Sequence, residues 1–170
     1  MPSFVTIPLL FVFPVLMAFA ASSDLITMRI TNKLVLAVAG SFLVVALVAG
    51  LPLELIGMHA LAGVAVLAVS FGLFALGWIG GGDAKLVAAT AMWFGFTHML
   101  QYLLMAALLG GALTLILLLA RRFPLPYPLK SVAWIDRLHD TKTGVPYGIA
   151  LAGAGLLVYP VSLVFQRLAG

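Results

Sequence analysis

The sequence predicts an all-α fold: a polytopic membrane bundle of about six transmembrane helices, with both termini outside the cytoplasm. Of the 170 residues, 64% are hydrophobic and only 8% are charged, whereas about a quarter of a soluble domain is charged. The apolar residues form runs of roughly 20, which is the length of a helix that crosses a bilayer. Because these runs follow one another closely, we expect residues 1–170 to form a single integral-membrane domain.

The chain divides, in order, into apolar spans separated by short polar segments. No lysine or arginine precedes the first run, whereas Arg29 and Lys33 follow it. That order favours a retained helix with its N-terminus outside over a cleaved signal peptide. Residues 22–33 are then the first polar loop. The expected spans are residues 1–21, 34–51, 58–78, 86–94, 99–120 and 145–165.

The apolar stretch 86–120 is ambiguous, because it is too long for one ordinary span and barely long enough for two. Residues 95–98 (Gly-Phe-Thr-His) are the natural break. With that break, the polar segment 121–144 lies on the same side as Lys85, and eight of the nine basic residues share one face. The positive-inside rule favours this solution and makes that face cytoplasmic.

The polar segment 121–144 contains alternate prolines in residues 123–128, so that stretch cannot be regular helix. Residues 131–139 are expected to form a short amphipathic helix at the membrane surface. Within it, Asp136, His139 and Asp140 could hold a metal, but a solvated face in a basic loop is the favoured interpretation. No metal and no cofactor is therefore predicted.

Two observations limit the class of function. The chain has no cysteine, which excludes a thiolate nucleophile and cysteine-bound zinc. The net charge of +4 is explained by the cytoplasmic loops, so no nucleic-acid partner is expected.

His59 and His98 stand apart from the other polar residues and are expected at the opposite membrane boundary.

The glycine-rich stretch 80–85, Gly-Gly-Gly-Asp-Ala-Lys, places Asp83 between two long apolar runs. A carboxylate at a membrane boundary is costly, and this makes Asp83 a candidate functional residue. The preceding glycines carry no side chains, so a substrate backbone could approach closely. The alternative is a flexible turn in which Asp83 merely caps the start of a helix.

A second carboxylate, Asp24, ends the first span, at the same predicted boundary as Asp83. Two facing carboxylates can share one proton, so that one activates water while the other polarises the scissile carbonyl. A helix N-terminus favours negative charge at Asp83, so we expect Asp83 to be the base and Asp24 the acid. The alternative is that Asp24 is an interfacial cap paired with Arg29.

Three motifs in sequence order resemble the bacterial type IV prepilin peptidase family. They are Asp24-x4-Arg29-Ile30-x-Asn32, Gly80-x-Gly82-Asp83-x-Lys85 and Pro146-Tyr147-Gly148-x-Ala150. The resemblance implies that Asp24 and Asp83 are the catalytic pair. It implies a substrate-binding or site-shaping role for Gly80, Gly81, Gly82, Lys85, Arg29, Asn32, Pro146, Tyr147 and Gly148. Thr31 departs from the pattern, because the family commonly has proline there.

The resemblance also implies an activity: an intramembrane aspartic endopeptidase that removes the short basic leader from prepilins at the cytoplasmic face of the bacterial inner membrane, usually after a glycine. The implied partners are the prepilin, the membrane lipid and the pilus assembly machinery. Without cysteines, and starting directly at the first span, the chain is similar to the short form without the N-methylation region, of the tight-adherence (Flp) type. The residues alone leave another class open: a non-catalytic assembly component or small transporter that uses the Asp24/Asp83 pair for protons or cations.

Overall fold

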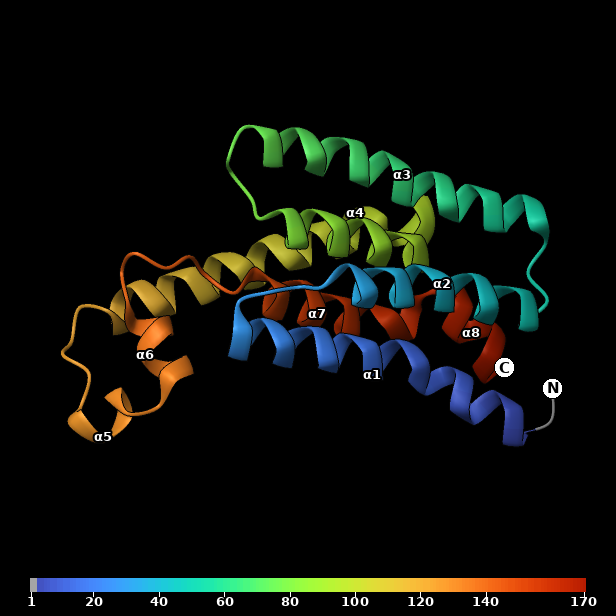
Figure 1. Ribbon diagram of the computed structural model, residues 1–170. Coiled ribbons are helices and arrows are strands. Elements are labelled where there is room, and N and C mark those ends of the chain that lie inside the picture. Colours follow the sequence, from blue (N-terminus) through green and yellow to red (C-terminus); the bar gives the residue numbers. More distant parts are fainter. Residues whose placement is uncertain (1–2) are drawn as a thin grey trace.

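The structure, a computed structural model, describes residues 3–170, and these residues form helices and no strands. The predicted all-α class is therefore confirmed for the described chain. Figure 1 shows the long helices lying side by side, with α5 and α6 set apart at one end. The elements are α1 (Ser3–Thr27), α2 (Asn32–Val48), α3 (Leu53–Ala75), α4 (Gly81–Ala120), α5 (Tyr127–Lys130), α6 (Ala133–His139), α7 (Tyr147–Val158), a 3-10 turn (Tyr159–Val161) and α8 (Leu163–Ala169).

Three of the helices in residues 3–170, namely α1, α3 and α4, are long and apolar enough to cross a membrane. A fourth span results if α7 and α8, which meet at 50°, count as one. The expected last span is therefore not continuous. Pro160 lies in the 3-10 turn, and the Ser162 hydroxyl starts α8 by accepting a hydrogen bond from Phe165 N–H at 3.2 Å. The apolar helix α2 has only 17 residues.

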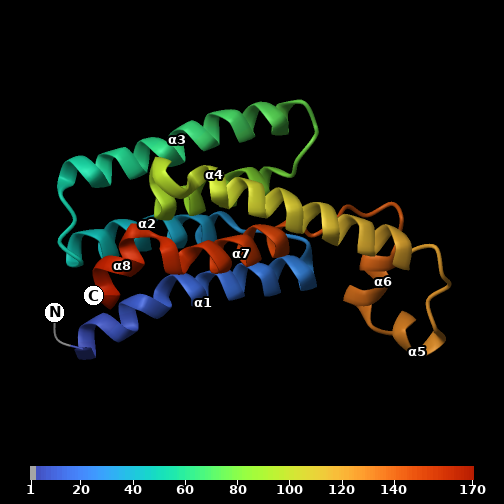
Figure 2. The ribbon, with the colours of Figure 1, turned by 180° about the vertical axis from the view of Figure 1, so that it is seen from behind.

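The predicted break near residue 95 is confirmed inside α4. Gly95 has φ 56° and ψ −173°, which is not helical. The rings of Phe94 and Tyr102 lie 5.0 Å apart across the break, whereas eight residues of continuous helix would span about 12 Å. Figures 1 and 2 show the first half of α4 (residues 81–94) and its second half (residues 96–120) running in opposite directions.

The expected polar loop 22–33 is mostly helical, because α1 continues to Thr27 and α2 already begins at Asn32. Two hydroxyls donate to carbonyls four residues earlier in α1: Ser22 to Ala18 at 2.8 Å, and Thr27 to Ser23 at 2.7 Å. These polar side chains are thereby satisfied without leaving the helix. As a result, Asp24 projects from the last turn of α1 rather than from a loop.

Both α3 and α4 begin five residues earlier than expected, at Leu53 and Gly81. Each first turn carries one acidic residue, Glu54 or Asp83. A helix N-terminus favours negative charge, so these polar residues belong to the helices and not to the turns before them.

The core of the bundle is aromatic and lies between α1, the first half of α4 and the C-terminal turn. Phe13 packs at 4.8 Å from both Trp93 and Tyr159 (ring centroids). The Trp93 indole donates to the Val38 carbonyl of α2 at 3.0 Å. One buried polar contact of α3 with the first half of α4 is a hydrogen bond from the Ser70 hydroxyl to the Ala84 carbonyl, at 3.0 Å.

His59 was expected at the membrane boundary, but it is only 4% exposed and stacks on Phe42. Its Nδ1 lies 2.8 Å from the Met92 carbonyl, to which it donates. The break at Gly95 removes the helical N–H that would otherwise reach this carbonyl. The imidazole therefore caps the first half of α4, which explains why a histidine is buried here.

Candidate active site

The packing of α1 against α4 brings the two aspartates together. The two helices are antiparallel, since Phe13 contacts Trp93 and Met17 contacts the Thr90 hydroxyl at 3.9 Å. Asp24 lies seven residues after Met17 (24 − 17), and Asp83 lies seven residues before Thr90 (90 − 83). Seven residues are about two helical turns. The carboxylates therefore reach the same level of the bundle from two different helices.

Asp24 is nearly enclosed, with 5% of its surface exposed. Its Oδ2 accepts a hydrogen bond from the Gly148 N–H at 2.7 Å. Within residues 3–170 it has no basic partner, so the pairing with Arg29 considered above is wrong. A Cβ on Gly148 would lie 2.8 Å from that same oxygen, which means that residue 148 must be glycine for this contact to form.

Asp83 is the third residue of α4, and the residue at the N-cap is Gly80. Asp83 is therefore not the N-cap residue itself. Its carboxylate reaches back to the backbone of Gly80, as the third residue does in a capping box. A Cβ on Gly80 would lie 2.9 Å from Oδ2 of Asp83, and one on Gly82 would lie 3.1 Å from Cβ of Ile30. These glycines provide room for close packing.

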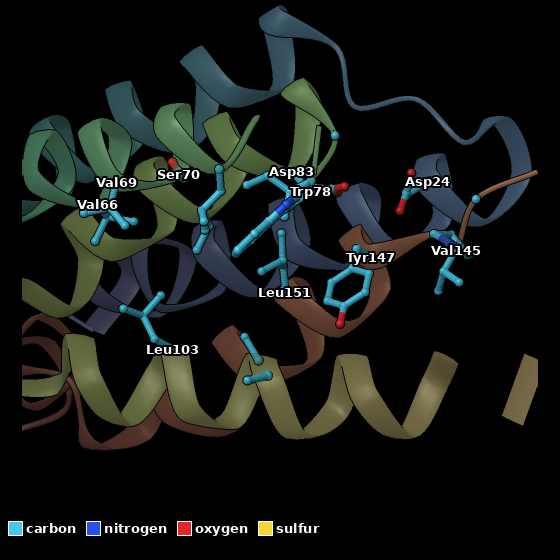
Figure 3. Close-up of a pocket in the computed structure, with 18 of the residues that line it drawn as sticks. Asp24, Val66, Val69, Ser70, Trp78, Asp83, Leu103, Val145, Tyr147 and Leu151 are labelled. Atoms are coloured by element: carbon cyan, nitrogen blue, oxygen red, sulfur yellow. The ribbon is translucent and has the colours of Figure 1, made fainter. Parts of the chain in front are cut away.

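Two cavities meet at the aspartates. The larger, of about 1160 Å³, lies between α3, the second half of α4 and α7. The smaller, of about 390 Å³, is lined by residues 28–31 and 80–82. Asp24 and Asp83 line both, and Figure 3 shows them with the walls of the larger cavity. The pair therefore stands where the two spaces join.

The larger cavity is elongated and mostly apolar. Its lining residues on the second half of α4 run from Met99 to Thr114, which is about 22 Å of helix at 1.5 Å per residue. Val66 and Val69 of α3 and Leu151 of α7 form the facing walls. An apolar, helix-shaped ligand would match these dimensions.

The structure gathers most of the residues that the motifs predicted. Pro146 and Tyr147 line the larger cavity, and Arg29 lines the smaller one. Lys85 and Asn32 line neither cavity and instead bond to each other, with Nζ 3.0 Å from Oδ1. These two residues join the start of α4 to the start of α2, so their contact supports the site from outside.

Two arginines that sequence reasoning assigned only to topology hold the 121–144 segment in place. Arg137 of α6 donates to the Ile26 carbonyl at 2.8 Å, in the last turn of α1 beside Asp24. Arg121 donates to the carbonyls of Leu138 and Gly144 at 2.8 and 3.0 Å. No sequence signal distinguishes such arginines from topology charges, because their partners are backbone carbonyls far away in the chain.

The two aspartates at α6, one within it and one at its C-cap, are not part of this site. Asp136 and Asp140 are exposed, and Asp140 accepts from the Lys142 N–H at 2.9 Å. In the part of the chain that the structure describes, no three histidine, aspartate or glutamate side chains are grouped so that they could hold a metal.

An all-helical fold with several apolar spans and a buried acidic site defines a multi-pass membrane protein with a candidate hydrolytic centre. The type IV leader peptidase family matches residues 11–115, well over half of the chain. The chain belongs to this family, as the motifs predicted. The matched region contains Asp24 and Asp83 and ends before Pro146. No curated protein and no solved structure matches the chain. Membership makes the chain a peptidase of the prepilin-processing kind in general.

Proposed function

We propose that this peptidase is an aspartic endopeptidase, with Asp24 and Asp83 as its catalytic pair, and that it removes the basic leader from prepilins. The observation that carries the proposal is the position of the pair. Two carboxylates from different helices stand at the junction of a large apolar cavity and a smaller cavity. A peptide that crosses this junction would present its backbone to both carboxylates.

In the proposed reaction, water lies between the two carboxylates and the scissile carbonyl. The ionised Asp83 takes a proton from the water, whose oxygen bonds to the carbonyl carbon, while Asp24 gives its proton to the carbonyl oxygen. The resulting gem-diol collapses as Asp83 gives the proton that it took from water to the amide nitrogen, Asp24 takes a proton back from one gem-diol hydroxyl, and the C–N bond breaks. Gly148 N–H occupies Oδ2 of Asp24, which leaves Oδ1 to carry the transferable proton.

The cavities suggest how a precursor would bind. A helix with its side chains fills about 120 Å³ per residue, taking a radius of about 5 Å and a rise of 1.5 Å. The larger cavity, about 1160 Å³, would therefore hold roughly ten residues of the apolar stem that follows the cut. The leader side would then lie in the smaller pocket, where Gly80, Gly81 and Gly82 line the wall beside the residue before the cut.

The proposal includes a topology. Six spans result from α1, α2, α3, the two halves of α4, and α7 with α8. Both termini would lie outside the inner membrane, and the catalytic pair would lie at its cytoplasmic face. This is supported by the basic loop segment with α5 and α6, which lies at the same end of the bundle as the connection between α3 and α4 (Figure 1). We treat residues 1–170 as one peptidase domain.

The substrate class is proposed to be Flp-type prepilins, with the pilus assembly machinery as a further partner. Longer family members are expected to carry zinc-binding cysteines for N-methylation, and this chain has no cysteine. The order of the three motifs, together with the lack of cysteine in residues 1–170, supports this substrate class.

The experiment that tests the proposal is cleavage of a co-expressed prepilin, followed as a mobility shift. Asp24→Asn and Asp83→Asn should each lower cleavage at least about 100-fold, because loss of a positioned acid or base costs that much. Both variants should still accumulate in the membrane, since the amide keeps the size of the carboxylate. Asp136→Asn and Asp140→Asn are matched controls at exposed aspartates and should cleave normally. Substantial cleavage by either active-site variant would overturn the proposal and favour a non-catalytic use of the pair.

A further inference from the structure

The connection between α3 and α4 carries a large aromatic side chain that neither the motifs nor the proposed chemistry uses. Trp78 is 75% exposed, yet it lines the larger cavity together with Asp83. Figure 3 shows its indole reaching into the cavity, close to Asp83 in that view. An exposed tryptophan at the entrance to a reactive pair is a candidate contact for the substrate.

Two hydrogen bonds hold the backbone at Trp78. Gly77, at φ +75°, follows the C-cap of α3 and its N–H donates to the Phe74 carbonyl at 2.9 Å, while Trp78 N–H donates to the Leu73 carbonyl at 3.0 Å. These two hydrogen bonds are the pair that closes the C-terminus of a helix, and the positive φ at residue 77 requires glycine. The indole is therefore presented from a fixed backbone, with only its two side-chain torsions free.

The position of Trp78 assigns it to one side of the cut. Asp24 and Asp83 line both cavities, but Trp78 lines only the larger one. If the apolar stem occupies the larger cavity, the first side chain after the cut lies next to the catalytic pair, on the side where the indole is. Across the cavity are Leu103 and Leu151, so the space opposite the indole is apolar.

We propose that Trp78 is a specificity-determining residue that selects a large apolar side chain immediately after the cut. The inference rests on the proposed function. Packing of an apolar side chain against the indole face removes both from water or lipid headgroups, whereas a small or hydroxylated side chain leaves that face unfilled. A contact of this kind raises rate or affinity by roughly 2- to 10-fold.

The test compares three precursors that differ only in the residue after the cut, which is leucine, alanine or serine. The full-length protein in membranes should show a higher kcat/KM for leucine than for serine. Trp78→Ala should lower kcat/KM for the leucine precursor by about 3- to 10-fold and leave the serine precursor within about 2-fold. Trp78→Phe should keep most of the preference, because it keeps an aromatic face.

A matched control is Phe71→Ala, since Phe71 is an aromatic of α3 that is 61% exposed and does not line the cavity. It should leave the preference unchanged. If Trp78→Ala lowers kcat/KM equally for all three precursors, or leaves the preference unchanged, the role of Trp78 is overturned while the proposed function stands. Cleavage that persists in Asp24→Asn or Asp83→Asn, or no cleavage by the unchanged protein, would overturn the proposed function and this inference with it.

Discussion

Single glycines determine how the two carboxylates are held. Gly148 donates its N–H to Asp24, and Gly80 lies against the carboxylate of Asp83. In both places the absence of a Cβ matters because an oxygen occupies the space that a Cβ would need. The sequence motifs contain these glycines, and the structure gives the steric reason for them.

At the residue scale, Gly148→Ala should displace the carboxylate of Asp24. The new Cβ would meet Oδ2 at 2.8 Å and Cδ1 of Ile30 at 2.9 Å, so the hydrogen bond to the residue 148 N–H must lengthen. We expect cleavage to fall at least about 10-fold, because a misplacement of about 1 Å costs up to roughly 100-fold. The measurement is the initial rate of prepilin cleavage at equal membrane levels of protein.

The matched control for this prediction is Gly153→Ala in the same helix. Its Cβ would lie 3.4 Å from Leu109, an ordinary contact, so cleavage should stay near that of the unchanged protein. Equal rates for both variants would show that the close contact at residue 148 does not position Asp24.

At the scale of one element, the break in α4 decides which residues share the site. Because the chain reverses at Gly95, the first half of α4 carries Asp83 to α1, while the second half forms a wall of the larger cavity. A continuous helix of 40 residues would carry the second half away from Asp83. His59 and Gly95 meet at this reversal, with no room between them.

Gly95→Ala should therefore destabilise the protein. The backbone at φ 56° and ψ −173° lies in a region that is essentially restricted to glycine, and the added Cβ would lie 2.7 Å from Nε2 of His59. We expect a loss of about 1–3 kcal/mol or more, measured as a lower midpoint of thermal unfolding in detergent. Gly111→Ala, in the same helix with open space around it, should unfold near the temperature of the unchanged protein. An unfolding midpoint for Gly95→Ala as high as that of the control would argue against the reversal at this residue.

For the whole molecule, the distribution of basic residues predicts how the bundle sits in the bilayer. Reporter fusions after Lys33, Lys85 and Lys130 should all report the cytoplasm, and a fusion after Glu54 should report the outside. The reason is that basic loops are retained on the cytoplasmic side. If the fusions after Lys85 and Lys130 report opposite sides, the six-span arrangement is wrong.

Much of this protein follows from local sequence pattern. Long apolar runs with few charges specify membrane helices, because unpaired backbone groups and charges are costly in lipid. The break near residue 95 could be predicted because the stretch was too long for one span and glycine was available. The family could be recognised from three short motifs, and the match over residues 11–115 confirms it.

The remaining features depended on tertiary contacts that no local pattern records. The end of α1 and the starts of α3 and α4 differ from expectation. Hydroxyls near the end of α1 bond within that helix, and the first turns of α3 and α4 each take in an acidic residue, which a helix N-terminus favours. His59 is buried rather than interfacial because its partner, the Met92 carbonyl, becomes free only when α4 breaks. The register between helices decides the remaining contacts. It sets the level at which Asp24 meets Asp83, the hydrogen bond from Gly148 N–H to Asp24, and the cavity beside Trp78. That register is set by side-chain packing between distant segments, so the sequence alone could name the two aspartates but only the folded bundle could assemble the site around them.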